Sequence, residues 1–502
     1  MKETLQKMQA HLGKVRDLMM AGAVLSWDRE TYMPQGGAAG RARQLGTLSQ
    51  MAHELFVSDE VGQWLETLAP YEAEQDFDSD ESSLIRVTRR DYERERRVPS
   101  ELVGELARAA SLGQQTWVRA RQESDFSIFQ PSLEKLVALR IRWAECFDYG
   151  ESIYDPMLDF FEPGLTTAKV QAIFDEFRPP LVELVAAIAE RQGRVDAGCL
   201  EGNFSEGAQW ELGLEALRLM GFDFECGRQD RSAHPFTTSF SSNDVRITTR
   251  VDPRSIASAL FSTIHEGGHA LYELGVSPAL DTTLLGNGAS MTIHESQSRL
   301  YENVLGRSLP FWRYFYPKLQ ARFPHFQDVE LETFYRAINR VQPSFVRVEA
   351  DEVTYGLHII LRFELEQALV TGELAVADAP AAWNAKMESY LGLTPPNDTL
   401  GVLQDVHWSG GMIGYFPDYL LGSMLSVQLF AKAREGMPDL LSQIEAGRLA
   451  DLLAWLREKV HTHGRKFTLD EITRRVLGTN LSPQPYLNYL RERYGEIYGL
   501  GS

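Results

Sequence analysis

Two histidines four residues apart, with a glutamate between them, form the segment of this chain with the clearest chemical pattern. The residues are His265, Glu266 and His269, in the stretch IHEGGHA at 264–270. On a helix each residue turns about 100°, so both imidazoles lie on one face, one turn apart, and can reach one ion. Glu266 lies beside that face, where it can hold a water molecule and act as general base. The spacing predicts a hydrolytic metal centre.

A catalytic zinc usually has three protein ligands, so a third must come from outside this segment. Glu273 would lie too far along the same helix, and the extended HExxHxxGxxH pattern is absent. Glu295 is the leading candidate, because it opens a second amphipathic helix after a connection rich in Gly, Ser and Thr. Glu302 and His294 remain competitors. Thr292–Glu295 also fits a helix capping box, which would give Glu295 a purely structural role.

Most of the sequence has helical periodicity, which predicts a mainly α-helical fold. Apolar residues recur at three- and four-residue steps, with charges on the opposite face. The helical stretches are residues 131–147, 166–191, 346–370 and 424–460, besides a helix over 261–274 that carries the metal motif. Pro179 and Pro180 are expected to bend or break the second of these stretches.

Residues 234–251 are the main exception to this helical pattern, because they are rich in Thr, Ser, Phe, Val and Ile. Ser242, Asn243 and Asp244 in the middle favour a turn. The pattern predicts a β-hairpin just upstream of the metal motif. A strand in that place could pair its edge with an extended peptide.

The two glycines of the metal motif, Gly267 and Gly268, are poor helix formers and together cost about 2 kcal/mol of helix preference relative to Ala. By the rotation per residue, Gly267 points away from the metal, where its missing side chain could let a neighbouring helix approach closely. Gly268 flanks the site, where a larger residue could crowd the substrate or the hairpin backbone. We therefore expect the helix to form in spite of them.

Composition and charge exclude several classes of protein. The chain has 502 residues, 44% of them hydrophobic and 24% charged, with no apolar run of the roughly 18 residues that a membrane span requires. The net charge of −20 has no compensating Lys/Arg block, which argues against nucleic acid or an anionic membrane as partner. Because repeats and long linkers are absent, residues 1–502 are expected to form one catalytic domain with two lobes.

The N-terminus and the cysteines both predict a cytoplasmic protein. The stretch MKETLQKMQAHLGKVRD lacks the apolar region typical of a secretory signal. Cys146, Cys199 and Cys226 are odd in number and have no CxxC spacing, so we expect reduced thiols.

Seven sequence blocks, in one order along nearly the whole chain, resemble those of the Taq-type metallocarboxypeptidases, relatives of the neurolysin-like and angiotensin-converting peptidases. The blocks are WDRETYMPQGG at 27–37, HPF at 234–236, DVRIT at 244–248, HEGGH at 265–269, HESQSR at 294–299, VRVEAD at 346–351, and GVLQDVHW at 401–408 running into SGGMIGYFPDY. A set of this kind is far more specific than a lone HExxH.

The resemblance implies a large helical, two-lobed, neurolysin-like fold with a deep active-site groove and a small β-sheet at its edge. It also implies one divalent ion per subunit, zinc or cobalt, bound by His265, His269 and Glu295, with Glu266 as base. It further implies a cytoplasmic homodimer that removes single residues from peptide C-termini with broad specificity and a poor response to C-terminal proline. Arg299 stands where neurolysin-like relatives have Asp, so the partner of a ligand histidine stays unassigned.

A hydrolytic centre of this kind also needs a donor for the oxyanion of the tetrahedral intermediate. In the stretch HWSGGMIGYFPDY, His407 and Tyr415 are the candidates. On the residues alone, a buried structural histidine and an ordinary core aromatic are the favoured alternatives. The resemblance implies the catalytic roles, because related peptidases place a His and a Tyr at comparable spacing over the oxyanion.

A carboxypeptidase must recognise a terminal carboxylate, which a planar guanidinium does best. Arg347 in VRVEAD is the first candidate, and an internal salt bridge to a nearby acidic residue is its alternative role. Arg246 of DVRIT and Arg250 follow, with His234 of HPF as a nearby donor. The competing functions are an endo-acting oligopeptidase on the same fold and a scaffold that keeps zinc only for stability.

Overall fold

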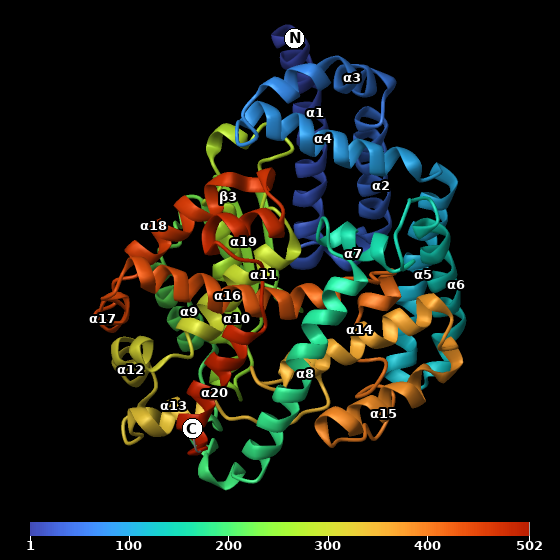
Figure 1. Cartoon of the computed structure of the whole chain (residues 1–502). Helices are drawn as coiled ribbons and strands as arrows, with labels where there is room; N and C mark the ends of the chain where they lie inside the picture. Colours follow the sequence, from blue (N-terminus) through green and yellow to red (C-terminus); the bar gives the residue numbers. More distant parts are fainter. Residues whose placement is uncertain (501–502) are drawn as a thin grey trace. The chain divides into compact units, whose positions relative to one another are not determined.

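The computed structural model describes residues 1–500 and is built mainly of helices, which confirms the predicted fold class (Figure 1). The chain divides into two compact units, each assembled from three separate stretches. Unit 1 contains residues 1–96, 197–338 and 428–480, and unit 2 contains residues 97–196, 339–427 and 481–500. Neither unit is a continuous module of the sequence. Within residues 1–500, no helix is long and apolar enough to cross a membrane.

Unit 1 holds most of the helices of the chain. They are α1 (Lys2–Thr31), α2 (Ala38–Phe56), α3 (Asp59–Glu74), α4 (Asp80–Arg97), α9 (Glu206–Met220), α10 (Ile256–Glu273), α11 (Met291–Arg299), α12 (Leu309–Arg322), α13 (Leu331–Ile338), α17 (Leu440–Glu445), α18 (Ala450–Lys459), α19 (Leu469–Leu477) and a short π-helix, η6 (Leu300–Leu305). Helices α1 and α2, blue in Figure 1, lie side by side. The apolar core under the N-terminal helices includes the fully buried Leu12, Val61, Ile85 and Leu285.

Unit 2 is wholly helical in its regular elements. Its helices are α5 (Ser100–Glu123), α6 (Gln130–Ala144), α7 (Asp155–Phe161), α8 (Thr167–Ala189), α14 (Tyr355–Thr371), α15 (Ala379–Leu391) and α20 (Gln484–Tyr498), and α16 (Phe416–Gly436) contributes to both units. Helix α14 is buried on nearly every side, with Leu357, Ile359 and Phe363 fully inaccessible to solvent. Its buried positions also include His358, Arg362 and Glu366, so this helix lies in the core of the unit and buries charged groups there.

The small sheet lies in unit 1 and has three strands, β1 (Gly227–Arg231), β2 (Thr237–Ser241) and β3 (Asp244–Thr249), in the order β1-β3-β2. Strands β2 and β3 pair in antiparallel fashion, which confirms the predicted hairpin. Strand β1 pairs with β3 in parallel and was not predicted, because its sequence GRQDR has none of the β-branched or aromatic residues typical of strands. Strand β3 packs against α10.

Two of the four predicted helical stretches have the extent that the sequence suggests. Residues 131–147 correspond to α6, and residues 166–191 correspond to α8. The expected break does not occur, and α8 continues through Pro179 and Pro180. Buried side chains such as Phe177 and Leu181 hold this helix in place, and such packing supplies most of the stability of helices in proteins.

The other two predicted stretches are wrong at their boundaries. Helix α14 begins only at Tyr355, because the carboxylate of Asp351 accepts the backbone N–H groups of Val353 and Thr354 and closes a turn before the helix. The stretch 424–460 contains the end of α16, all of α17 and α18. Helix α16 ends at Gly436, two residues before Pro438, and Gly447 has the left-handed φ of 69° that follows the end of α17.

Candidate functional site

Helix α10 carries the HExxH motif, as predicted. Its N-cap is Ser255, whose side chain accepts a hydrogen bond from the backbone N–H of Ser258. The rings of His265 and His269 lie on one face with centroids 4.9 Å apart. Both are partly accessible, whereas Glu266 between them is only 7% exposed. The helix therefore presents the two imidazoles together to one location.

The two glycines of the motif permit close packing of two different helices. A Cβ atom at Gly267 would lie 2.7 Å from Leu217 Cδ2 of α9, so the predicted approach of a neighbouring helix is confirmed. A Cβ atom at Gly268 would lie 2.6 Å from the backbone oxygen of Gln297 and 2.7 Å from Ser298 Cα, both in α11. The crowding that we expected from the substrate or the hairpin comes instead from the backbone of α11.

Gly268→Ala is expected to destabilise the fold by about 2 kcal/mol, since overpacking against a fixed backbone costs roughly 1–3 kcal/mol. Gly267→Ala is the matched control, because its Cβ meets the ends of flexible side chains and gains about 1 kcal/mol of helix propensity. Urea unfolding of both variants measures the difference. Equal destabilisation would contradict the assigned contact. Gly268→Ala should also weaken metal binding, because α11 carries Glu295.

Helix α11 supplies the third candidate ligand. The N-cap is Ser290, whose side chain accepts from the backbone of Ile293, so the alternative capping box at Thr292–Glu295 does not form. Glu295 Oε2 lies 3.7 Å from His265 Nε2 and 3.4 Å from His269 Nε2. One ligand atom from each residue lies within 4.8 Å of the others. Two imidazole nitrogens and one carboxylate oxygen form the donor set of a catalytic zinc site.

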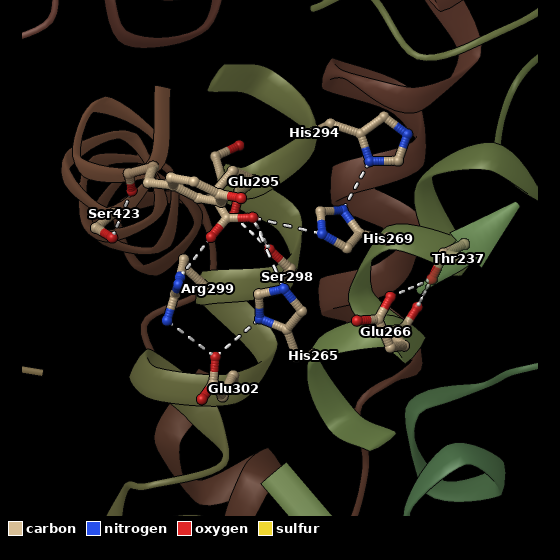
Figure 2. A network of polar contacts seen from close by, with 12 residues as sticks. Thr237, His265, Glu266, His269, His294, Glu295, Ser298, Arg299, Glu302 and Ser423 are labelled. Atoms are coloured by element: carbon tan, nitrogen blue, oxygen red, sulfur yellow. Dashed lines mark hydrogen bonds and ion pairs between the residues drawn. The ribbon is translucent and has the colours of Figure 1, made fainter. Parts of the chain in front are cut away.

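Glu302, one of the competing ligands, is instead the partner of His265. Its Oε2 atom lies 2.9 Å from His265 Nδ1, which directs the other ring nitrogen, Nε2, toward Glu295 (Figure 2). Arg299 donates to both carboxylates, from Nε to Glu295 at 2.6 Å and from Nη1 to Glu302 at 3.2 Å. The π-helix η6 places Glu302 within reach, and such single-turn π segments are frequent at functional sites. Glu302 is therefore the hydrogen-bond partner of His265 that the sequence left unassigned.

His294, the other competing ligand, is the partner of His269. The Nδ1 atoms of the two rings are 2.7 Å apart, and His294 Nε2 lies 2.8 Å from Glu273 Oε1. Glu273 also accepts the backbone N–H of Gly288 at 3.0 Å. With a carboxylate at the end of this chain, His294 donates from Nε2 and accepts at Nδ1, which leaves His269 Nε2 as the lone-pair nitrogen. Both competitors thus contact and orient the two histidines predicted as ligands.

The charges in the site suit a cation. Although burial opposes it, Arg299 and the two imidazoles hold the pKa of Glu295 well below its usual range. Burial and the neighbouring His294 lower the pKa of His269 to about 4, so this ring is neutral at pH 7. Burial disfavours the charged form of His265, but Glu295 and Glu302 raise its pKa. The ionised Glu295 and the neutral His269 are forms that bind metal, and an ion would displace a proton from His265, so the residues fit a divalent ion.

Glu266 lies beside this donor set without belonging to it. Thr237 of β2 donates its hydroxyl to Glu266 Oε2 at 2.6 Å and contacts the Glu266 backbone oxygen at 3.0 Å, so the carboxylate is next to the sheet (Figure 2). Burial raises the pKa of Glu266 above its usual range. A carboxylate whose pKa moves toward neutrality suits a general base. Thr237 was not among the predicted site residues, although it directly follows the HPF block.

His407 and Tyr415 lie together in unit 2, with ring centroids 5.5 Å apart. His407 Nε2 is 3.2 Å from the hydroxyl of Tyr419, which sequence reasoning did not single out. Burial lowers the pKa of His407 to about 3, so its ring is neutral. Gly411 and Gly414 have positive φ values of 68° and 100°, which bend the chain between the two side chains.

Arg347 is also in unit 2 and is 6% exposed. Its Nε and Nη2 atoms lie 3.0 and 2.9 Å from Asp405 Oδ1, and Nη1 donates to the Tyr355 hydroxyl at 3.1 Å. Asp405 also binds Arg362, which is fully buried, through a 2.7 Å hydrogen bond from Nε. The internal salt bridge considered for Arg347 is present, but its acidic partner is 58 residues away in the GVLQDVHW block. The only sequence signal for this pairing is the unusual charge of Asp405 among the apolar residues of that block.

The other predicted substrate-binding residues lie in unit 1, around the sheet. Arg246 on β3 pairs with Asp244 at 2.9 Å, and its guanidinium lies 4.4 Å from the centroid of the Trp27 ring. Arg250 and His234 are exposed. The structure thus places the predicted metal ligands, Glu266 and these three residues in unit 1, and the remaining candidates in unit 2.

Comparison with known proteins gives one consistent assignment. Residues 7–494 match the sequence profile of the family described as "Carboxypeptidase Taq (M32) metallopeptidase". The chain is 39% identical to Carboxypeptidase 1 of Bacillus subtilis over 97% of both chains, and 40% identical to Thermostable carboxypeptidase 1 of Thermus thermophilus over 96% of both. A crystal structure of an M32 carboxypeptidase from Deinococcus radiodurans is similar over 99% of this chain and 100% of that one, with a TM-score of 0.96 and 39% identity. The chain therefore belongs to the carboxypeptidase Taq (M32) family of metallopeptidases and is a metallocarboxypeptidase.

Proposed function

We propose that this metallocarboxypeptidase removes single residues from peptide C-termini, with broad specificity and with C-terminal proline disfavoured. The observation that carries the proposal is the donor set of His265, His269 and Glu295 with Glu266 directly beside it. A structural metal site has no need of a base next to an open coordination position. The arrangement therefore favours hydrolysis over a scaffold that keeps its metal only for stability.

The three donors suit one zinc ion per subunit, with cobalt as the alternative, because they leave a fourth position open. A bound ion of this kind polarises the scissile carbonyl and lowers the pKa of water to near 7. Glu266 takes the proton of the attacking water and later gives it to the leaving amine. The hydroxyl of Thr237 fixes the orientation of this base. Burial of Glu266 keeps competing water away from its carboxylate.

His407 and Tyr415 are the proposed donors to the oxyanion. A neutral imidazole still carries one N–H donor, so the low pKa of His407 is compatible with this role. The close approach of the two rings supports a shared target, since a single substrate oxygen can lie within reach of both. Preorganised donors of this kind contribute about 3–4 kcal/mol each to transition-state stabilisation in other hydrolases.

Arg347 remains our first candidate for the terminal carboxylate, with Arg246, Arg250 and His234 behind it. Asp405 holds the Arg347 guanidinium in one orientation. A guanidinium has five N–H donors, so those that Asp405 and Tyr355 leave over can bind a second carboxylate. The acidic partner also keeps the arginine charged in its buried position, because it raises the pKa of Arg347 in spite of burial.

We further propose a cytoplasmic homodimer that acts on peptides, with neither nucleic acid nor membrane as partner. The net charge of −20, without a basic segment to offset it, supports the exclusion of polyanions.

A pair of peptides that differ only in C-terminal amidation tests the direction of attack. We expect mass spectrometry to show stepwise loss of single C-terminal residues from the free peptide, with cleavage of the amide at least about 100-fold slower, because a charged hydrogen-bond partner is lost. A chelator should stop both reactions, and added zinc or cobalt should restore them. Undiminished cleavage of the amide would overturn the proposal in favour of an endo-acting oligopeptidase. A third peptide ending in proline tests the expected preference.

A further inference from the structure

A buried carboxylate in unit 2 binds both ends of the loop that carries His407 and Tyr415. Glu366 lies on α14 and is fully inaccessible to solvent. Its Oε1 atom accepts the indole N–H of Trp408 at 2.8 Å, and its Oε2 atom accepts the backbone N–H of Gly414 at 2.9 Å. Trp408 directly follows the first proposed oxyanion donor, and Gly414 directly precedes the second.

A third donor completes the coordination of this carboxylate without belonging to the loop. The hydroxyl of Tyr154, just before α7, donates to Glu366 Oε2 at 2.5 Å. A buried ionised carboxylate is costly unless hydrogen bonds satisfy it, and here three donors do so. Burial nevertheless raises the pKa of Glu366 to about 7, because the ionised carboxylate is disfavoured in the core. A residue with a purely structural role there would be more stable without this charge.

The end of the loop at Gly414 and Tyr415 also packs against helix α7. Gly414 has a φ of 100°, and a Cβ atom there would lie 2.5 Å from the backbone oxygen of Met157 in α7. The ring of Phe161, also in α7, lies 5.0 Å from the ring of Tyr415 in edge-on contact. With Gly414 held between Glu366 and α7, the direction of the next residue is determined. Trp408 is also held from a second side, because its ring contacts that of Trp383 edge-on with centroids 6.0 Å apart.

We propose that Glu366 is a positioning residue for the reaction, setting the distance and orientation of His407 and Tyr415 by binding Trp408 and Gly414 at once. The inference rests on the proposed oxyanion role of these two side chains. Helix α14 then has a second function besides packing, because Glu366, 41 positions before His407 in the sequence, determines the geometry of the loop. A misplacement of about 1 Å in a catalytic group can lower the rate about 100-fold.

Glu366→Gln is a sharp test, because the amide has the shape of the carboxylate but only one acceptor oxygen. If the amide oxygen accepts the backbone N–H of Gly414, the NH₂ group faces the indole N–H of Trp408. If the amide is rotated by half a turn, the NH₂ group faces the backbone N–H of Gly414. The Tyr154 hydroxyl can rotate to accept, whereas the two loop donors cannot. Tyr154→Phe is therefore the matched control, as it removes one hydrogen bond from Glu366 and leaves both loop contacts intact.

The experiment measures kcat and KM for an unblocked peptide with the metal-loaded enzyme. We expect Glu366→Gln to lower kcat about 10- to 100-fold with KM changed less than about threefold, and Tyr154→Phe to stay within about threefold of the wild type. Trp408→Phe should lower kcat in the same direction. In a Tyr415→Phe background, Glu366→Gln should have a much smaller effect, because residues that act as one unit are not additive.

The outcomes separate this inference from the proposed function. If Tyr415→Phe and His407→Asn lower kcat but Glu366→Gln does not, the positioning role alone is overturned. The same holds if the fold losses of kcat from Glu366→Gln and Tyr415→Phe multiply in full in the double variant. If neither Tyr415→Phe nor His407→Asn lowers kcat, the oxyanion assignment itself is overturned. Thermal unfolding establishes that each variant is folded at the assay temperature. Should Glu366→Gln not fold, Trp408→Phe against Tyr154→Phe decides, and equal kcat values in that pair overturn the positioning role.

Discussion

Glu266→Gln is expected to lower kcat about 10³-fold while the protein keeps its bound metal, since general-base catalysis contributes roughly 10²- to 10⁴-fold. The amide preserves the shape of the side chain and the hydrogen bond from Thr237, but it cannot accept a proton from water. It leaves His265, His269 and Glu295 untouched. Peptide hydrolysis and metal content, measured on the same preparation after dialysis, check the two halves of this expectation.

Glu273→Gln is the matched control for this substitution. Glu273 is a second buried glutamate on α10, and its carboxylate binds His294 and Gly288 instead of facing the donor set. An amide oxygen can still accept from His294, so kcat should fall by no more than about 10-fold, the lower end of the range expected for an outer partner of a ligand. Retained activity in Glu266→Gln would contradict the general-base mechanism. Loss of metal from that variant would make Glu266 a ligand.

The parts of the fold that local pattern determines were predictable. The metal helix, its two histidines and the hairpin of β2 and β3 depend on spacing and composition within about 20 residues. Gly267 and Gly268 reduce helix propensity, yet α10 forms, because α9 and α11 can approach closely only where these side chains are missing. Packing therefore outweighed the low helix propensity of glycine. The rotation per residue of a helix still predicted the direction in which each glycine points.

Residues that act across long sequence separations were not predictable from the same patterns. Asp405 pairs with Arg347 from 58 positions away, and Glu302 contacts His265 from 37 positions away. Spacing could show only that Glu302 was an acidic residue within a few turns of Glu295, so ligand and outer partner were indistinguishable. The π-helix η6, which has no recognised sequence signal, shifts the register and places Glu302 against His265. Strand β1 was missed for a related reason, because β3 and not its own composition makes it a strand.

Glu295→Gln against Glu302→Gln tests this difference of roles directly. Both substitutions remove one charge from a carboxylate that Arg299 binds, with side chains that are 6% and 14% exposed. Glu295→Gln should lose the metal on dialysis and the peptidase activity with it, because an amide is a poor substitute for a carboxylate ligand. Glu302→Gln should keep one ion and bind it about 10- to 100-fold more weakly, because only the orientation of His265 is affected.

Titration of the metal-free proteins with zinc by calorimetry measures both effects without relying on turnover. If Glu302 were the third ligand, the order of the two variants would be reversed, with Glu302→Gln the one that loses its metal. Saturating zinc provides a further distinction. It should restore activity to Glu302→Gln, since an outer partner limits occupancy and ring orientation, whereas Glu295→Gln should stay inactive because a two-histidine site lacks the third anchor that holds the ion beside Glu266.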